Sequence, residues 1–208
     1  SELVQAWNGT AWVQAKIGTL PFRCAANYPA LSSVWGSNNF GFHFCKNLAA
    51  YKKAVVRMIL VSFDGNSIVN WIPSTDPNYV AIQDAITDAG VTKIDYFLWH
   101  QGETDESQTY SFYKAQWELL KAQLRSESWF PTTTPIVVGG LLRQSAGGIQ
   151  YEQDENLQTF DYDPDNLVGY ASSKGLTSNG LDPYHFSGSS LVELGKRYFN
   201  VAISLPRQ

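Results

Sequence analysis

The feature that most constrains the fold is a series of continuous apolar runs alternating with segments of helical periodicity. The apolar runs cover residues 54–63, 93–100, 135–141 and 166–171. The helical patterns cover residues 40–51, 79–89, 107–126, 151–160 and 187–203. Strands that are apolar throughout are buried on both faces. The order therefore predicts an α/β domain whose mainly parallel sheet is covered by helices on both sides.

The first forty residues lie outside this alternation. An Asn8-Gly9 pair between apolar runs in residues 3–16 predicts a β-hairpin, because Asn-Gly readily adopts the backbone of a tight turn. Residues 19–39 are rich in Pro, Ser, Asn and Gly and predict a long loop. No internal repeat, low-complexity tract or linker divides the sequence, so we expect residues 1–208 to form a single domain.

Charge and hydropathy argue against two classes of partner. Fifteen basic and nineteen acidic residues give a net charge of −4, and the basic residues form no long run, so we expect no nucleic-acid partner. No apolar stretch approaches the roughly 20 residues that span a bilayer, so we expect no membrane partner. The N-terminal residues lack the pattern of a signal peptide.

The two cysteines, Cys24 and Cys45, have no neighbouring Cys or His at the spacing of a zinc site. Two small buried side chains are the favoured interpretation. A single disulfide between them stays open.

Polar residues follow two of the predicted strands, at the sheet edge where α/β proteins bind ligands. Gln101 follows the second strand, and its side-chain amide can donate to a developing oxyanion. Gly65 follows the first strand and can bring a backbone N–H close to the same oxyanion. Taken alone, these segments fit a strand cap and a generic turn equally well.

Asp182 and His185 lie three residues apart just before the last predicted helix. The carboxylate can accept the Nδ1–H of His185, which fixes the tautomer and leaves Nε2 as a general base. The plain alternative is an Asp-Pro turn with an incidental histidine. Because His43 falls within a helix and His100 beside a buried strand, His185 is the candidate base.

In this order, three segments resemble the SGNH hydrolase superfamily, in its branch of sialic-acid O-acetylesterases and related carbohydrate acetylesterases. They are Asp64-Gly65-Asn66-Ser67, Trp99-His100-Gln101-Gly102-Glu103-Thr104-Asp105 and Asp182-Pro183-Tyr184-His185-Phe186. The second is the most specific. Residues 4–12, 38–48 and 181–198 also resemble esterase domains of bacteriophage tail proteins.

The resemblance implies a flavodoxin-like, three-layer α/β/α fold with strand order 2-1-3-4-5, and a Ser-His-Asp triad without metal or cofactor. His185 would be the base and Asp182 its orienting partner. Gly65 and Gln101 would supply the N–H groups of the oxyanion hole. Glu103 and Asp105 match motif positions that we assign to loop architecture.

The nucleophile of this superfamily is missing from its expected place, a Gly-x-Ser-Asn turn after the first, central strand. Neither the turn nor the strand is found before Asp64. Three explanations stay open. The strand is supplied by a segment or chain outside these residues, or another serine is the nucleophile, with Ser37 the nearest match in the sequence. In the third, the domain is an inactive descendant that still binds a glycan. We favour the first.

The expected function is serine-type hydrolysis of acetyl groups from an acetylated glycan or a small acetyl ester. The alternative is a catalytically inactive glycan-binding domain that retains the esterase fold. The Trp99–Glu103 segment points to sugar esters and argues against a lipid esterase of the same superfamily. A glycan substrate favours an extracellular or virion-associated location.

Overall fold

A computed structural model of the chain describes residues 3–24, 27–31, 38–143, 149–162 and 167–206. Its strands are β1 (Val4–Trp7), β2 (Trp12–Gln14), β3 (Pro21–Cys24), β4 (Asn27–Leu31), β5 (Val56–Met58), β6 (Phe97–Trp99), β7 (Ile136–Gly139) and β8 (Val168–Ala171). Its α-helices are α1 (Phe40–Lys52), α2 (Pro77–Asp88), α3 (Tyr110–Ser126), α4 (Ile149–Gln158) and α5 (Gly188–Ser204). Short 3₁₀ helices cover Ile68–Trp71 and Thr159–Tyr162.

The described strands form three sheets. In the first, β1 pairs antiparallel with β2 and parallel with β5, in the order β2-β1-β5. The second has the order β6-β7-β8 and is parallel throughout. The third is the antiparallel pair β3-β4. The prediction of an α/β fold with mainly parallel pairing in its central strands is confirmed.

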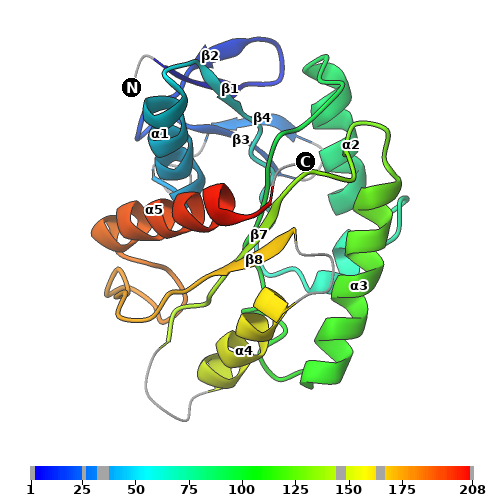
Figure 1. Cartoon of the computed structure of the whole chain (residues 1–208), viewed down its shortest axis with the longest axis vertical. Coiled ribbons are helices and arrows are strands. Elements are labelled where there is room, and N and C mark those ends of the chain that lie inside the picture. The colour runs from blue at the N-terminus through cyan, green and yellow to red at the C-terminus, as the bar shows by residue number, and fades with distance from the viewer. Residues whose placement is uncertain (1–2, 25–26, 32–37, 144–148, 163–166, 207–208) are drawn as a thin grey trace.

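Helices lie on both sides of the strands (Figure 1), with α1 beside α5 on one side and α2 and α3 on the other. The side chains of β7 show how this divides the core. Ile136 and Val138 belong to the cluster under α2 and α3, whereas Val137, between them, belongs to the cluster under α1 and α5. A buried strand alternates its side chains between two faces, so the apolar run fills both clusters and produces the three-layer arrangement.

The helix boundaries follow local capping chemistry. Asn39 begins α1 by accepting a hydrogen bond from Phe42 N at 2.8 Å, and Ser187 begins α5 by accepting one from Ser190 N at 3.2 Å. Ser187 is also the first residue of the predicted helical range 187–203. Gly90 directly follows the predicted range 79–89 and has a φ of +62°, a left-handed conformation that glycine adopts without strain.

The prediction of a long loop over residues 19–39 is wrong, because β3 and β4 lie within it. Proline is not a barrier here. Pro21 occupies the first position of β3 and pairs with Leu31, and a two-stranded sheet leaves an outer edge on each strand where a missing N–H costs no ladder bond.

The first two strands of the apolar series are shorter than predicted. Only residues 56–58 of the 54–63 run, and 97–99 of the 93–100 run, form ladders. Each of these strands is paired along one side only, β5 with β1 and β6 with β7, among the residues described. A ladder extends only as far as the neighbouring strand does, so each of these apolar runs forms a strand only along its single described partner.

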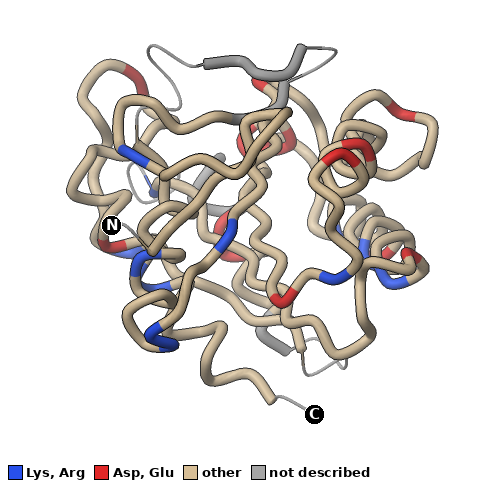
Figure 2. Tube along the Cα trace, turned by 90° about the horizontal axis from the view of Figure 1, so that it is seen from above, with Lys and Arg blue, Asp and Glu red and all other residues tan. Residues whose placement is uncertain are grey.

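Cys45 lies buried in α1 as a free thiol, and burial raises its pKa to about 12. This confirms the favoured interpretation for Cys45, while the side chain of Cys24 lies outside what the structure describes. Basic and acidic residues are spread over the trace (Figure 2). Among the described residues, no helix is long and apolar enough to cross a membrane.

Close packing of α5 on α1 depends on Gly195. A Cβ at this position would lie 2.5 Å from Phe40 O and 2.6 Å from the Cβ of His43. We therefore expect Gly195→Ala to lower the free energy of unfolding by about 1–3 kcal/mol, the usual cost of overpacking, despite alanine's higher helix propensity. Urea unfolding followed by circular dichroism measures this.

Gly188→Ala, in the first turn of the same helix, is the matched control. A Cβ there meets only Asn38 Nδ2, at 3.7 Å. This variant should unfold at the wild-type urea concentration or above it. Equal midpoints for the two variants would contradict the packing argument.

Candidate active site

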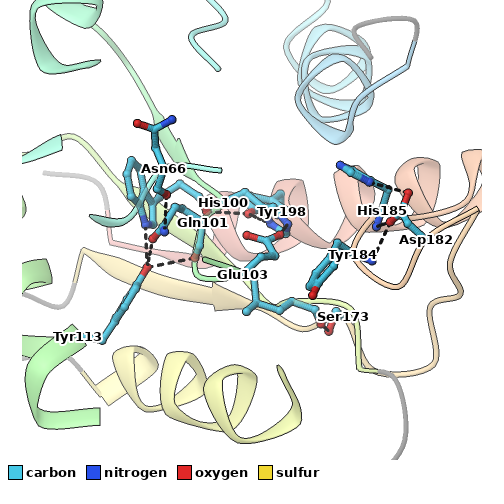
Figure 3. Close-up of polar contacts among 12 residues, drawn as sticks. Asn66, His100, Gln101, Glu103, Tyr113, Ser173, Asp182, Tyr184, His185 and Tyr198 are labelled. Carbon is cyan, nitrogen blue, oxygen red and sulfur yellow. Dashed lines mark hydrogen bonds and ion pairs between the residues drawn. The ribbon is translucent and has the colours of Figure 1, made fainter. Parts of the chain in front are cut away.

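Candidate residues from three loops line one cleft of about 1630 Å³. Gly65 follows β5, Gln101 follows β6, and His185 precedes α5, and all three residues line this cleft. Asp182 is joined to the cleft through His185 (Figure 3). The structure thus brings together the four assigned residues that it describes. Ser37, the nucleophile candidate nearest to the expected motif in the sequence, lies outside the described residues.

The Asp182–His185 pair has the geometry expected from the sequence. Asp182 Oδ2 lies 2.8 Å from His185 Nδ1. With Nδ1 facing the carboxylate, proton transfer by this imidazole would use Nε2. The imidazole is about half exposed, with 49% of the side-chain surface accessible, so a substrate can reach it. That His185 acts as a base stays a prediction.

The loop before α5 fixes this pair through its own backbone. Asp182 Oδ1 accepts hydrogen bonds from Tyr184 N and His185 N, both at 2.8 Å. An antiparallel bridge between Ser178 and Phe186 closes the base of the loop. Asp182 therefore forms the turn and also orients the imidazole. The turn and the oriented histidine, which the sequence left as alternatives, are both present.

Burial raises the pKa of Asp182, but the hydrogen bonds from the His185 side chain, from the backbone of His185 and Tyr184, and from Asn179 outweigh it. The pKa falls to about 2. The carboxylate is therefore charged at any pH at which an esterase is assayed, and it can stabilise the imidazolium formed when His185 takes a proton.

Gln101 occupies the predicted position with its side chain engaged. Its Nε2 donates to Asn66 O at 3.1 Å and to Asp105 Oδ2 at 2.6 Å. Its Oε1 accepts from Tyr113 OH at 2.8 Å. Both amide hydrogens are thus donated within the protein. Donation to an oxyanion requires one of them to be released, and the longer bond, to Asn66 O, is the weaker of the two.

Asp105 joins the loop after β6 to the loop after β5. Its buried carboxylate accepts from Ser67 Oγ at 2.5 Å and Ile68 N at 2.7 Å, in addition to Gln101. These bonds fit the architectural role assigned to this motif position. A charged group that is 2% exposed requires such partners, and it fixes where Gln101 can lie.

Glu103 and His100 form a second ionisable pair in the cleft, with Oε1 and Nε2 3.5 Å apart. Burial raises the pKa of Glu103, but the hydrogen bond and charge of His100, assisted by His185, lower it below its usual value. Glu103 therefore places a negative charge near the candidate base, which adds an electrostatic role to the loop role expected for it.

Sequence reasoning missed Tyr198 and Tyr113, whose hydroxyl groups form hydrogen bonds with residues 99–101 at the end of β6. Tyr198 OH donates to Trp99 O at 2.8 Å and lies 3.2 Å from His100 Nδ1. Gly139 makes room for it, because a Cβ there would lie 1.7 Å from the Tyr198 hydroxyl. The signal available in the sequence was only the apolar periodicity of α3 and α5, which marks such tyrosines as core residues.

Residues 139–143, at the carboxyl end of β7, do not line the cleft. Arg143 is paired with Asp154, whose other oxygen accepts from Tyr170 OH at 2.5 Å. This buried network packs the loop against α4. Within the described ranges, no group of three or more His, Cys, Asp or Glu side chains is placed to hold a metal ion.

The depressed pKa of Asp182 predicts how the pair titrates. The charged form is stabilised in the folded state, so its contribution to stability is complete above the ordinary pKa of 3.8 and is lost as the pH falls to about 2. Carbon-13 NMR of the Asp182 carboxyl should show a midpoint near pH 2. In His185→Ala the midpoint should rise toward the ordinary value, and an unchanged midpoint would contradict the assigned cause.

Comparison with known proteins gives a family and a fold. Residues 3–204 match the protein family described as carbohydrate esterase, sialic acid-specific acetylesterase. Curated protein sequences give no match. A solved structure of a protein from Arabidopsis thaliana superposes with a TM-score of 0.74 at 18% identity, covering 98% of this chain and 82% of that one.

A carbohydrate acetylesterase from Xanthomonas citri superposes with a TM-score of 0.67 at 18% identity, over 98% of this chain and 50% of that protein. At these identities the two superpositions show a shared fold. The match over residues 3–204 shows the family: the chain belongs to the carbohydrate esterases of the sialic acid-specific acetylesterase family, as the resemblance predicted. An origin in a bacteriophage tail stays a prediction.

Proposed function

We propose that this member of a carbohydrate esterase family is a serine-type O-acetylesterase that removes acetyl groups from an acetylated glycan. One observation carries the proposal. A histidine whose Nδ1 faces a charged carboxylate at 2.8 Å lines the same cleft as Gly65 and Gln101. A base with a fixed tautomer beside potential oxyanion donors is the arrangement that acyl transfer requires.

In the proposed reaction His185 Nε2 accepts the proton of a serine hydroxyl while the serine oxygen attacks the acetyl carbonyl carbon. The carbonyl π bond opens to a tetrahedral oxyanion. As that oxyanion collapses, the bond to the sugar oxygen breaks, and the imidazolium gives its proton to the departing sugar oxygen. Water then attacks the acetyl-serine while the same nitrogen takes its proton; the second oxyanion collapses, the bond to the serine oxygen breaks, the imidazolium returns the proton to that oxygen, and acetic acid leaves and ionises to acetate.

The oxyanion is the point at which Gly65 and Gln101 act. Gly65 lines the cleft in a turn where it adopts a φ of +64°, and its backbone N–H is the proposed first donor. Gln101 contributes by exchanging its bond to Asn66 O for one to the oxyanion, while Asp105 keeps the amide oriented. Such donors stabilise charge that develops only in the transition state.

The identity of the serine is the open part of this mechanism. Among the described serines, Ser62 is the one that lines the cleft, and Ser67 is bonded to Asp105. Labelling with a serine-reactive fluorophosphonate, followed by peptide mapping, identifies any nucleophile within residues 1–208. Label on a peptide containing Ser62 or Ser37 would assign the nucleophile to that residue.

The base is tested by His185→Ala, with His43→Gln as the matched control on a histidine that does not line the cleft. Release of acetate from an acetylated oligosaccharide should fall about 10³-fold or more in His185→Ala, because serine is a weak nucleophile without its base. The control should keep wild-type activity. The assay is run with purified, folded chain.

Two results would overturn the esterase proposal. One is no acetate release by a folded sample of the chain. The other is activity that His185→Ala leaves unchanged. Glycan binding that persists without hydrolysis would favour the inactive glycan-binding alternative instead.

The oxyanion assignment is tested by Gln101→Ala against Tyr113→Phe. Removing Gln101 should lower turnover about 10²–10³-fold, the usual effect of losing one oxyanion donor. Tyr113→Phe removes the bond to Gln101 Oε1 and keeps the amide donor, so its effect should be much smaller. Equal effects would mean that Gln101 acts by loop structure alone.

A further inference from the structure

Acidic side chains gather at the catalytic end of the cleft, which is formed by the loops after β5 and β6 and the loop before α5. Asp64 lines the cleft in the first of these loops, and Glu103 and Glu106 line it in the second. In the third, Asp182 lies 2.8 Å from His185 Nδ1. Among the described side chains, no Lys or Arg from these three loops lines the cleft.

These carboxylates give the catalytic end a net negative charge. Burial raises the pKa of Glu103 and of Asp182, but hydrogen bonds from His100 and from His185 outweigh it, so both carboxyls are ionised at neutral pH. His185 must be neutral to accept a proton, so it offsets neither charge before the reaction begins. Even a protonated His100 would offset only one charge, that of Glu103 at 3.5 Å.

The cations that line the cleft lie away from its catalytic end. They are Lys52, Arg57 and Lys93, the last of which precedes β6. Lys52 is twelve residues along α1 from Phe40, whose ring centroid lies 5.2 Å from that of His100, and this separation is about 18 Å along the helix axis. Arg57 lies over the Trp12 ring, 5.1 Å from its centroid. Salt at physiological concentration screens charges beyond about 8 Å, so Lys52 does little to the field at His185.

The sequence supplies no further cation to this end from the internal segments that the structure does not describe. Residues 25–26, 32–37, 144–148 and 163–166 contain neither Lys nor Arg. A cleft whose end carries one sign of charge focuses that field on a ligand.

Tyr184 adds an aromatic surface beside the base. It directly precedes His185, lines the cleft and is 41% exposed (Figure 3). The face of an aromatic ring is the negative part of its quadrupole, so it attracts the C–H groups of a sugar ring and not a carboxylate. The aromatic ring and the acidic groups therefore favour the same kind of sugar.

The proposed reaction brings the sugar ring close to these groups. With the acetyl carbonyl at Gly65 and Gln101, the sugar oxygen must lie within reach of His185, which returns the proton to it. Glu103 is near enough to His185 for their charges to interact, and Asp182 contacts the imidazole directly. A carboxylate on the same sugar would therefore meet like charges, which disfavour binding and the transition state alike.

We propose that the acetylated sugar accepted by this site is uncharged, and that Glu103 and Asp182 disfavour sugars that carry a carboxylate. The inference rests on the proposed esterase function and narrows its substrate class. Sialic acid, which the description of the family names, is such a carboxylated sugar. This member of the family would therefore act on acetyl groups of a neutral glycan.

The test compares two acetylated sugars that differ in charge alone. One is the methyl glycoside of tri-O-acetylglucuronic acid, and the other is its primary amide, in which a neutral group of nearly the same shape replaces the carboxylate. Full acetylation leaves no free hydroxyl to which an acetyl group could migrate. Acetate release should give a kcat/KM about tenfold or more higher for the amide. A 9-O-acetylated sialoside and its amide at the carboxyl group should show the same order.

Glu103→Gln tests the cause, because it removes the charge and keeps the size of the side chain. The ratio of the two kcat/KM values should fall about threefold or more, whatever the variant does to the activity that both sugars share. Glu118→Gln is the matched control. Glu118 pairs with Lys121 on α3, does not line the cleft, and should leave the ratio unchanged.

Salt gives a second measurement on the unmodified chain. Raising the ionic strength from about 0.01 M to about 1 M shortens the Debye length from about 30 Å to about 3 Å. The kcat/KM of the carboxylate should rise relative to that of the amide.

The outcomes separate this inference from the proposed function. Equal hydrolysis of the two sugars, or faster hydrolysis of the carboxylate, would overturn the inference and leave the esterase function standing. A preference for the amide that neither Glu103→Gln nor salt changes would also overturn it, because the cause would then not be charge. Acetate release from neither sugar would contradict the esterase function, and the inference would fall with it.

Discussion

The buried carboxylate of Asp105 holds the candidate site together. It accepts hydrogen bonds from Ser67 Oγ, Ile68 N and Gln101 Nε2, and so ties the loop after β5 to the loop after β6. No ladder joins the two strands themselves among the residues described, so this one group supplies much of the registration between the sheets at their carboxyl ends. A carboxylate that is 2% exposed needs hydrogen-bond donors in place of water, so removal of any one of these three donors is expected to destabilise the arrangement.

The site is assembled from elements of unequal rigidity. Gln101 is fixed by buried partners on both sides of its amide, from Asp105 below and Tyr113 opposite. His185 lies in an exposed loop, and its orientation comes from Asp182 and from the Ser178–Phe186 bridge. The Gln101 side of the cleft is therefore the more rigid, and the His185 side the more accessible.

Much of the fold was predictable because its strands and helices differ in period. The hairpin at Asn8-Gly9, the cap at Ser187 and the stop at Gly90 follow from local chemistry that a sequence displays directly. The Asp182–His185 contact was predictable for the same reason, since both partners lie in one short loop. The strands β3 and β4 were not, because their pairing is tertiary and their composition resembles that of a loop.

What the sequence does not display is how distant segments meet. Nothing in the local pattern shows that Gln101 is bonded to Asn66, or that a tyrosine from α5 contacts Trp99 and His100. These contacts join residues tens of positions apart, and each partner alone fits an ordinary core or turn position.

The fit of Tyr198 over Gly139 has a consequence for divergence within the family. The backbone at residue 139 leaves no room for any side chain while the tyrosine ring is in place, since even a methyl group would overlap its hydroxyl. Changes at these two positions are therefore coupled. A homologue with a larger residue at the end of β7 is expected to carry a smaller one than tyrosine on α5, and to hold its equivalent of His100 by some other contact.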